Sequence, residues 1–446
     1  MFTLGGCSRL DRSRHDTNSG LLLKNIEKLL YNGIAYTATV LIIVYTNCVT
    51  MISMKTIAVL FGGKSTEHDV SIITALTSII RPLMTAGGYE IEPVYISKDG
   101  NWYWDQKLAE VSMYQSGEIT EFLRKAPKVH LLFDDGLTLV KSSQFAGRKQ
   151  YKKIDVVFPA MHGTHGEDGE LMGLLEMAGV PYVGCGPTAS AIAMDKVLTK
   201  LIVESFGLKT PKMKFFSRDE YIADSVSIQK EINDTLAYPV FVKPAHLGSS
   251  IGITKVDKKE DLANAVEIAA HYDTKVIVEE GVTDLIEVTL PIIGNEELKP
   301  AMVEQPMKLT ANGVFDFDSK YIGQGGKNGK GSGKSGDNEG AEGYSKIPAD
   351  IPKGLYDECV DVALRAYRAI GCEGIARVDL LIDGKSNTVY VNEINPMPGS
   401  LFAHNWRAAG VSNVQLVEDL IYLAEQKFKK KHRVTTTFDT NFLKQF

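Results

Sequence analysis

Short apolar runs rich in β-branched residues alternate with segments of helical periodicity along most of the chain. An amphipathic segment at residues 70–80 follows the first run, and another begins at Glu170. This alternation is typical of an α/β fold with a largely parallel sheet, and we expect it to form an N-terminal domain over residues 54–193. The strands predicted in this domain lie at residues 57–61, 91–96 and 154–158.

The same alternation continues in two further segments, which we place at residues 194–284 and 285–430. A tail follows at residues 431–446. In the first of the two segments we predict a helix at 194–206 and strands at 240–243 and 276–279. In the second we predict strands at 287–290 and 376–382 and, between them, a helix at 356–370.

A glycine-rich stretch interrupts the last of these segments. Residues 323–343 contain nine glycines together with Lys, Ser, Asn, Asp and Glu. Such a composition cannot bury a core, so the stretch is either a plain linker or a loop over a site. Its place directly after Lys320 and Tyr321 favours an active-site lid, which we expect over residues 322–345.

The first 53 residues stand apart from this pattern. They include most of an uncharged apolar run, residues 33–54, which is about as long as a membrane-spanning helix. Three interpretations stay open: a membrane anchor, a cleaved export signal, or translated upstream sequence. The last rests on Met51 and Met54, either of which would start the chain directly before the first strand. We therefore treat residues 1–53 as an extension of undetermined status, and expect membrane contact only if the run is an anchor.

Composition narrows the classes of partner. The chain has 446 residues, 44% hydrophobic and 23% charged, which is the balance of a globular protein with more than one domain. A net charge of -6 and a pI near 5.9 make nucleic acid and acidic membrane poor partners and favour a small-molecule substrate. The five cysteines form no CxxC pair, which argues against a disulfide framework or a zinc site and favours a reducing compartment.

The strongest chemical signal is a pair of strands with acidic residues near the end of the chain. Arg377 and Asp379 lie on the first, Glu393 and Asn395 on the second, and residues 383–387 between them have turn chemistry. A turn centred on Ser386 places Asp379 opposite Glu393 and Arg377 opposite Asn395, on one face. Two facing carboxylates favour a cation between them, and hard oxygen ligands select magnesium. The alternative is a solvated strand face with incidental acids.

A second signal combines lysines with a glycine-serine loop. Lys243 ends an apolar strand and is followed by Gly-Ser-Ser-Ile-Gly at residues 248–252. A cation beside exposed backbone N–H groups suits a phosphate chain, although such a loop alone is more often a simple turn. Lys196, in Met-Asp-Lys, favours the nucleotide interpretation.

Two motifs in the N-terminal domain remain open to more than one interpretation. The turn at residues 62–71 resembles a phosphate loop, but Glu67 and Asp69 place acids where phosphate would sit, so an ammonium group or a plain capping cluster fits better. His162 and His165 lack a third nitrogen or sulfur ligand at suitable spacing, which favours pocket lining over a metal site.

Taken in order, these motifs resemble the D-alanine-D-alanine ligase family of the ATP-grasp superfamily. The resemblance covers residues 56 to about 425, and the ordered set is far more specific than any one motif. The motifs are GGKSTEHDVS, HGTHGEDGELMGLLE, MDK, VKPAHLGSSIG, VIVEE, SKY, ARVDL and NEINPMPG. The resemblance implies a three-lobed ATP-grasp architecture with an N-terminal parallel-sheet (preATP-grasp) domain. It also implies ATP between the central and C-terminal subdomains, and amino acids where all three lobes meet.

The family pattern, transferred motif by motif, assigns roles to individual residues. In the implied ATP site, Glu279 faces the adenine and Glu287 the ribose. The residues implied to bind ATP are Lys196, Lys243, Ser250, Gly252, Glu279, Glu280 and Glu287. Those implied to hold two Mg²⁺ ions, or Mn²⁺ in their place, are Asp379, Glu393 and Asn395.

The same transfer implies a set of catalytic and substrate-binding residues. Glu67, Ser249 and Tyr321 resemble a hydrogen-bonded trio, with Glu67 also taking the ammonium of the first D-alanine. Arg377 and the backbone N–H of Gly399 would stabilise the tetrahedral intermediate. The implied substrate-binding residues are His162, Lys320 and His404.

The resemblance implies ligation of two D-alanine molecules through a D-alanyl phosphate, for peptidoglycan precursor synthesis, by a cytoplasmic homodimer. One departure concerns the second substrate, because residues 400–406 replace an expected Thr- and Ser-containing segment and His404 lies near a usual serine. The alternatives are therefore an acceptor such as D-serine, D-lactate or another amino acid, and a non-catalytic ATP-binding regulatory protein. Retention of the lysines and carboxylates together disfavours the last. The sequence reveals no base for the attacking amine.

Overall fold

A mostly parallel sheet forms the first part of the structure, a computed structural model that describes residues 54–142, 148–306 and 345–445. Its strand order is β3-β2-β1-β7, and the central strand β1 (Lys55–Gly62) pairs in parallel with β2 (Tyr89–Ile96) and β7 (Val156–Pro159). The edge strand β3 (Trp102–Trp104) is antiparallel. Residues 57–61 of β1 are buried, as expected of a strand covered on both faces. The predicted parallel sheet is thus confirmed for this part of the chain.

The helix after β1 is longer than its predicted range of 70–80. It runs without a break through α3 (His68–Ile73), the π-helical segment η1 (Thr74–Ile80) and α4 (Arg81–Ala86). Within the described ranges it is the one helix long and apolar enough to cross a membrane by length and composition. However, Ile79 and Leu83 are completely buried in the protein core, as in a core helix of a globular domain.

A second, antiparallel sheet in this region was not predicted. It has the order β4-β5-β6, with β4 (Val129–Phe133), β5 (Leu137–Ser142) and β6 (Lys149–Ile154). The strand predicted at 154–158 is corrected, because Asp155 separates β6 from β7 and accepts a hydrogen bond from the Thr56 N–H (2.8 Å). The helices of this part are η2 (Gln106–Ala109), α5 (Val111–Gln115), α6 (Glu118–Lys125), α7 (Glu170–Ala178) and α8 (Pro187–Met194).

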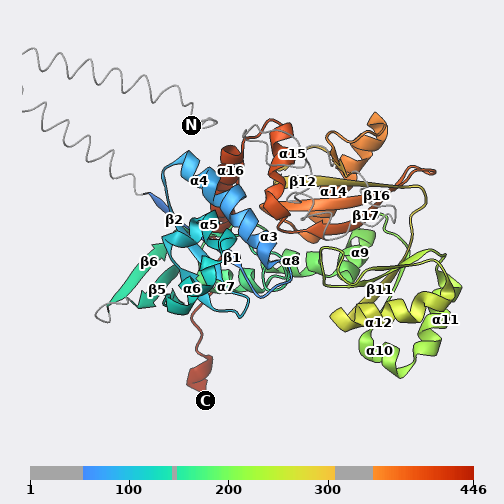
Figure 1. The fold of residues 1–446 in the computed structure, drawn as a ribbon, viewed down its shortest axis with the longest axis horizontal. Coiled ribbons are helices and arrows are strands. Elements are labelled where there is room, and N and C mark those ends of the chain that lie inside the picture. The colour runs from blue at the N-terminus through green and yellow to red at the C-terminus, as the bar shows by residue number, and fades with distance from the viewer. Residues whose placement is uncertain (1–53, 143–147, 307–344, 446) are drawn as a thin grey trace, which may run out of the picture. The chain divides into compact units, whose positions relative to one another are not determined.

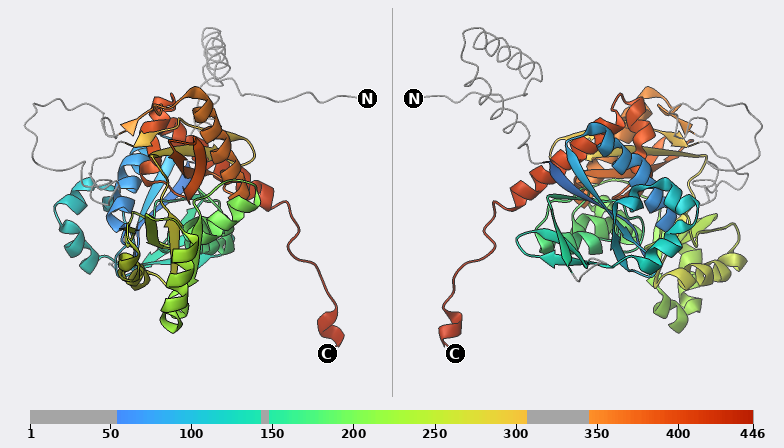
Figure 2. Two further views of the ribbon diagram at one scale, coloured as in Figure 1. Left: turned by 90° about the vertical axis from the view of Figure 1, so that its right-hand side faces the viewer. Right: turned by 60° about the vertical axis from the view of Figure 1, so that its left-hand side comes forward.

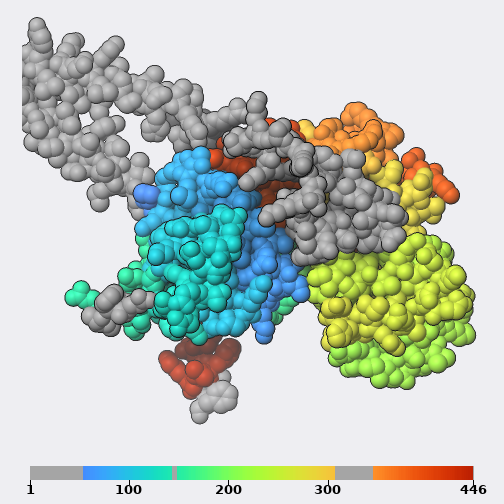
Figure 3. Space-filling view, in the orientation of Figure 1, coloured from blue at the N-terminus to red at the C-terminus, as the bar shows by residue number. Residues whose placement is uncertain are grey.

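The central part of the chain is built on an antiparallel sheet of order β10-β9-β11-β8. The surface of this part is the yellow-green region of Figure 3. Helix α12 (Leu262–Tyr272) packs on this sheet, which has a hydrophobic core of its own. The strands are β8 (Met213–Ser217), β9 (Val240–Pro244), β10 (Thr254–Val256) and β11 (Lys275–Glu280). The other helices are α9 (Lys196–Ser205), α10 (Arg218–Ala223), α11 (Ser225–Thr235) and η3 (Lys259–Asp261).

A third sheet, also antiparallel, has the order β13-β12-β16-β17, and helix α14 (Lys353–Ile370) packs against it (Figure 1). The strands are β12 (Leu285–Gly294), β13 (Leu298–Pro300), β16 (Ile375–Asp383) and β17 (Thr388–Asn395). A short pair, β14 (Gln305–Pro306) and β15 (Ser345–Lys346), lies beside the sheet. The remaining helices are η4 (Gly399–Phe402), α15 (Ala403–Ala408), α16 (Asn413–Lys431) and η5 (Phe442–Gln445).

The first and third sheets share one hydrophobic core. Helix α16 packs against α4 (Figure 2). Its Leu416 and Leu420 lie in the same hydrophobic cluster as Phe61 of β1 and Ile375 of β16. The chain from Lys55 onward therefore forms one compact unit. Residues 1–53, with the apolar run 33–53, and residues 307–344, with most of the predicted lid, lie outside the described ranges.

The shared core gives a prediction about stability. Changing Ile79 to Ala should lower the free energy of unfolding by about 2–5 kcal/mol, because the side chain is fully buried in that core. Thermal unfolding followed by circular dichroism measures the effect as a drop in midpoint. The control is Met84→Ala on the same continuous helix, where the side chain is 69% exposed, and equal midpoints for the two variants would contradict the packing described.

Candidate active site

The β16–β17 hairpin has the predicted register at its acidic residues. Asp379 lies opposite Glu393 and Arg377 lies opposite Asn395, with one irregularity after Asp379. Arg377 donates to both oxygens of Asp379, from Nε (2.7 Å) and Nη2 (2.6 Å). Thr289 Oγ1 (2.6 Å) and Asn395 Nδ2 (3.2 Å) also donate to this carboxylate. The four predicted side chains therefore share one face of the hairpin.

Protein cations neutralise both acids of the hairpin. Arg377 pairs with Asp379, and Lys196 Nζ lies 3.5 Å from the Oε2 of Glu393. The oxygens of Asp379, Glu393 and Asn395 are a hard donor set on two adjacent strands, each side chain only partly buried. Such a set fits magnesium whose coordination is completed by water and phosphate oxygens.

A buried charge group lies next to this hairpin. Glu279 of β11 is 2% exposed and forms ion pairs with Lys243 of β9 (2.6 Å) and Lys200 of α9 (2.8 Å). Burial opposes ionisation of Glu279, but the two lysines outweigh it and lower its pKa to about 2. Lys200 is fully buried and also donates to the carbonyl oxygen of Asn392 on β17 (2.9 Å). The side chain predicted to face adenine is thus held by two lysines.

Lys200 was not among the predicted site residues, although the sequence contained a signal for it. It follows Lys196 by four positions, so both lysines lie on the same face of α9. A lysine that shares a helix face with a phosphate-binding candidate is itself a candidate. That signal could not show that Lys200 would be completely buried.

The glycine-serine loop is held at its start. Ser249 and Ser250 adopt positive φ angles of 52° and 60°, and Gly252 has a φ of 72°. Lys196 Nζ donates to the carbonyl oxygen of Leu247 (2.6 Å), which ties the loop to the start of α9. Lys196 and Lys243 therefore flank the loop that the sequence associated with phosphate.

His246 clamps the same loop through two carboxylates. Its Nδ1 lies 2.9 Å from Asp273 and its Nε2 lies 3.3 Å from Asp195, which also caps helix α9 by accepting from the N–H of Val197. Hydrogen bonds to Asp195 and Asp273 raise the pKa of His246 to about 9. The ring therefore carries a positive charge at neutral pH.

Glu67, at the start of the helix that follows β1, contacts the glycine-serine loop. Glu67 is the N-cap residue of α3 and is buried, and its carboxylate accepts a hydrogen bond from Ser249 Oγ. Ser65 Oγ accepts from the Glu67 N–H (3.1 Å), and Asp69 pairs with Lys98 on the surface. Two members of the predicted trio are therefore in contact across 182 positions of sequence.

His162 is a buried, neutral histidine. Its Nε2 lies 2.9 Å from Thr74 Oγ1, and burial lowers its pKa to about 4. Glu167 accepts from the Gly163 N–H (2.7 Å), and burial, with Glu67 nearby, raises its pKa. Glu167 was not predicted as a site residue, although it belongs to the same motif. The pocket-lining interpretation of His162 stays a prediction.

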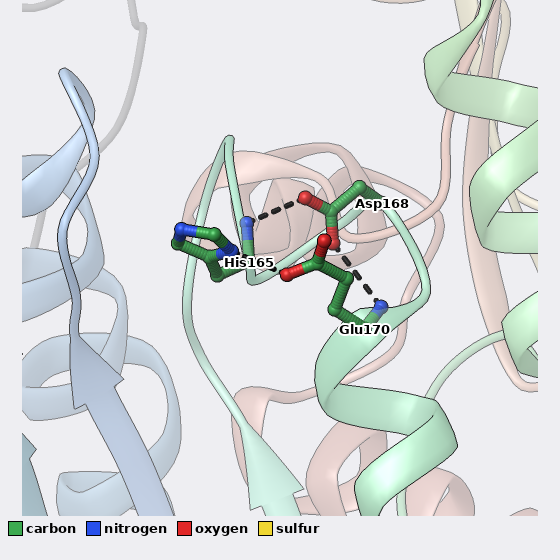
Figure 4. A group of neighbouring side chains, drawn as sticks. All are labelled: His165, Asp168 and Glu170. Atoms are coloured by element: carbon green, nitrogen blue, oxygen red, sulfur yellow. Dashed lines mark hydrogen bonds and ion pairs between the residues drawn. The ribbon is translucent and has the colours of Figure 1, made fainter.

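His165 lies apart from His162, in a group with Asp168 and Glu170 at the start of α7 (Figure 4). Ligand atoms of the three side chains lie within 4.8 Å of one another. However, the two oxygens of Asp168 accept from the N–H groups of His165 (2.6 Å) and Glu170 (3.2 Å). These bonds explain the group as a turn that begins a helix.

The other predicted residues fall around the same region, except those outside the described ranges. Glu287 lies two positions from Thr289 on β12, and so on the strand face that contacts Asp379. Glu280 ends β11 and accepts from the Ala237 N–H (2.9 Å). Gly399 begins η4, and His404 on α15 pairs with Glu304. Lys320 and Tyr321 lie outside the described residues.

Two descriptions of one known family match the chain, one in its N-terminal part and one in its C-terminal part. The family described as "D-ala D-ala ligase N-terminus" matches residues 56–185, and "D-ala D-ala ligase C-terminus" matches residues 202–422. The chain belongs to the D-alanine-D-alanine ligase family. It is therefore an ATP-dependent carboxylate-amine ligase with an ATP-grasp fold, as predicted from the sequence.

Individual members of this ligase family are similar over nearly their whole length. The D-alanine--D-alanine ligase of Acetivibrio thermocellus is 37% identical over 392 residues, which cover 84% of this chain and 96% of that protein. The corresponding ligase of Chlorobaculum tepidum is 37% identical over 388 residues, covering 86% and 100%.

Solved structures of ligases have the same fold. The VanG D-Ala:D-Ser ligase from Enterococcus faecalis aligns with a TM-score of 0.68 at 33% identity, covering 83% of this chain and 99% of that one. The D-alanine-D-alanine ligase from Coxiella burnetii aligns with a TM-score of 0.68 at 26% identity, covering 85% and 97%.

The clamp around His246 predicts a pH dependence of stability in this ligase. The pKa of His246 is raised on folding, so its contribution is complete below about pH 6.5, the pKa of an unperturbed histidine, and is lost as pH rises through about 9. Wild type and His246→Gln should therefore differ strongly in thermal midpoint at pH 6, and this difference should disappear by pH 10. Asp273→Asn should show the same pH dependence with a smaller difference in thermal midpoint. A difference in midpoint that does not change with pH would contradict the raised pKa of His246.

Proposed function

We propose that this chain joins two D-alanine molecules in the cytoplasm, using ATP and passing through a D-alanyl phosphate, to supply a peptidoglycan precursor. The observation that carries the proposal is the hairpin face with Asp379, Glu393 and Asn395, next to Lys196 and the buried lysine pair around Glu279. This face provides oxygen ligands for two Mg²⁺ ions, or Mn²⁺, and cations for phosphate oxygens.

The first step activates a carboxylate. A carboxylate oxygen of the first D-alanine attacks the γ-phosphorus of ATP, and ADP leaves. Lys196 and Lys243 flank the glycine-serine loop and neutralise charge on the phosphate chain. When bound at Asp379, Glu393 and Asn395, the metal ions neutralise further charge on the transferring group.

The second step forms the peptide bond. The amine of the second D-alanine attacks the acyl carbon, loses a proton, and phosphate leaves from the tetrahedral intermediate. Arg377 and the N–H of Gly399 provide donors for the oxyanion at that stage. Arg377 is held in place by its two bonds to Asp379, so its guanidinium is oriented before substrate arrives.

The first amino acid binds between the first sheet and the glycine-serine loop. The carboxylate of Glu67 takes its ammonium group, because an acid that is buried beside another acid, Glu167, favours a cationic ligand. Neutral His162, fixed by Thr74, lines the pocket without adding charge.

D-serine is the second candidate for the acceptor. The observation that favours it is the segment 400–406, which departs from the expected Thr- and Ser-containing sequence, together with 33% identity to a ligase named for D-Ala and D-Ser. The chemistry is the same for both acceptors, so only the product distinguishes them.

Substrate chirality is the first test. Protein from residue 54 onward should release phosphate from ATP and magnesium with D-alanine and not with L-alanine. The products with D-alanine alone, with added D-serine and with added D-lactate are identified by mass. An equal response to both alanine enantiomers would refute the D-specific assignment.

Removal of one carboxylate tests the metal assignment. Changing Glu393 to Gln should lower kcat by about 100-fold or more, because the site loses a charged oxygen ligand for the metal ions that would neutralise the transferring phosphate. Glu296→Gln, at an exposed ion pair with Lys430, is the matched control and should leave the rate unchanged. Near-normal turnover of a correctly folded Glu393→Gln protein would remove Glu393 from the metal site.

A further inference from the structure

A buried histidine that plays no part in the proposed reaction fixes the turn between β1 and α3. His68 is 2% exposed, and its Nδ1 lies 2.6 Å from the carbonyl oxygen of Gly63. Its Nε2 lies 3.0 Å from the hydroxyl of Tyr95 on β2. The ring therefore connects the first residue of α3 both to the turn before it and to the neighbouring strand.

The partners of His68 determine which ring nitrogen carries the proton. A carbonyl oxygen can only accept, so Nδ1 donates to Gly63 and Nε2 accepts from the hydroxyl of Tyr95. Burial lowers the pKa of His68, so the ring is neutral, and burial raises the pKa of Tyr95 to about 12, so the hydroxyl keeps its proton. Both ring nitrogens are thus satisfied inside the protein by a single tautomer.

The turn that His68 holds has no room for a different backbone path. Gly62 and Gly63 have φ angles of 90° and 99°, and a Cβ added to Gly62 would lie 2.2 Å from the carbonyl oxygen of Ile96. The N–H of Gly62 donates to Ser71 Oγ (2.7 Å), and the N–H of Gly63 donates to the carbonyl oxygen of Ile96 (2.7 Å). The turn is therefore fixed against both β2 and α3.

Glu67, the residue directly before His68, is enclosed by segments from elsewhere in the chain. Its carboxylate accepts a hydrogen bond from Ser249 Oγ. A Cβ added to Gly163 would lie 2.9 Å from Oε2 of Glu67, and a Cβ added to Gly248 would lie 3.3 Å from the same atom. Even a small displacement of Glu67 would therefore press its carboxylate against one of these segments or break its contact with Ser249.

Tyr95 belongs to a buried aromatic cluster that includes a second tyrosine. The ring of Tyr95 lies 5.5 Å from the ring of His68, 5.7 Å from that of Phe61 and 5.8 Å from that of Tyr114. The hydroxyl of Tyr114 donates to the carbonyl oxygen of Leu108 (2.9 Å). The two neighbouring tyrosines thus differ in their hydroxyl partner, which is His68 for one and a distant main chain for the other.

We propose that His68 is a positioning residue for the first amino acid, because its two hydrogen bonds fix where the carboxylate of Glu67 meets the ammonium group. The inference rests on the proposed function, in which Glu67 binds that group, and deepens it. His68 contacts no reacting atom and acts through the main chain beside Glu67. Its loss should therefore weaken binding of the first D-alanine and leave binding of the second unchanged.

Removal of one hydroxyl tests the inference with a matched control. Tyr95→Phe leaves Nε2 of His68 without its donor and should raise KM for the first D-alanine by about 3-fold to 10-fold. Tyr114→Phe removes the same atom from the neighbouring ring, so it should leave KM for both D-alanine molecules within about twofold of wild type. Loss of a buried hydrogen bond lowers the thermal midpoint in both variants, so a shift in midpoint alone does not distinguish them.

Substitution of His68 gives a second test, in which stability and binding follow opposite orders. His68→Leu removes both hydrogen bonds and should raise KM for the first D-alanine by about 10-fold or more. His68→Asn has an amide nitrogen near the position of Nδ1, so it should recover part of this loss through the bond to Gly63. Leucine is the more favourable of the two residues in a buried place, so stability alone would give the reverse order.

The measurement is dipeptide formation as a function of D-alanine, fitted with separate constants for the first and second molecule. KM for the second D-alanine and KM for ATP should stay within about twofold of wild type in every variant. Thermal midpoints of all variants are measured alongside.

Three results would overturn the inference. If Tyr95→Phe gives the same constants as Tyr114→Phe, or if His68→Leu raises both D-alanine constants equally, His68 has no positioning role although the chain is an active ligase. A wild-type chain that joins no D-amino acids refutes the proposed function and this inference with it.

Discussion

The arrangement of the candidate site depends on one buried carboxylate, Glu279. An isolated charge in that position would cost several kcal/mol, so the fold needs both Lys200 and Lys243 to reach it. These lysines come from α9 and β9, and Lys200 also binds the main chain of β17. One charge group therefore fixes the central sheet, the helix that precedes it and the acidic hairpin relative to one another.

The arrangement of the hydrophobic cores explains why polar contacts fix the central sheet relative to the other two. The first and third sheets share a hydrophobic core that includes Phe61 and Ile375, whereas the central sheet has a separate core around Val240. Where the central part meets the other two, the described contacts include ion pairs and hydrogen bonds, such as Ser249 with Glu67 and Lys196 with Glu393. A substrate that carries charge can bind at such a junction without disrupting a hydrophobic core.

The sequence predicted those elements that depend on residues close together in the chain. The turn residues 383–387 and the period of two fixed the register of Asp379 and Glu393, and the start of α7 at Glu170 followed from apolar periodicity. The sheet β4-β5-β6 was missed because β6 carries three lysines and the mainly apolar β4 leaves several of its residues exposed, so neither strand shows a clear alternation. The contacts of Lys200 and Glu304 depend on residues about a hundred or more positions away, which no local pattern encodes.

The two acids of the hairpin, Asp379 and Glu393, are neutralised by cations of the protein itself. The sequence predicted a cation between Asp379 and Glu393, and in the structure Arg377 pairs with Asp379 and Lys196 with Glu393. These side chains neutralise the acids when the protein is alone, so the hairpin is stable before any ion arrives. Under the proposed function, a metal ion held by Asp379, Glu393 and Asn395 would neutralise Glu393, and the phosphate oxygens of a nucleotide would then be available as partners for Lys196. In that case the same residues would exchange one set of ion pairs for another on binding, and would contribute both to stability and to function.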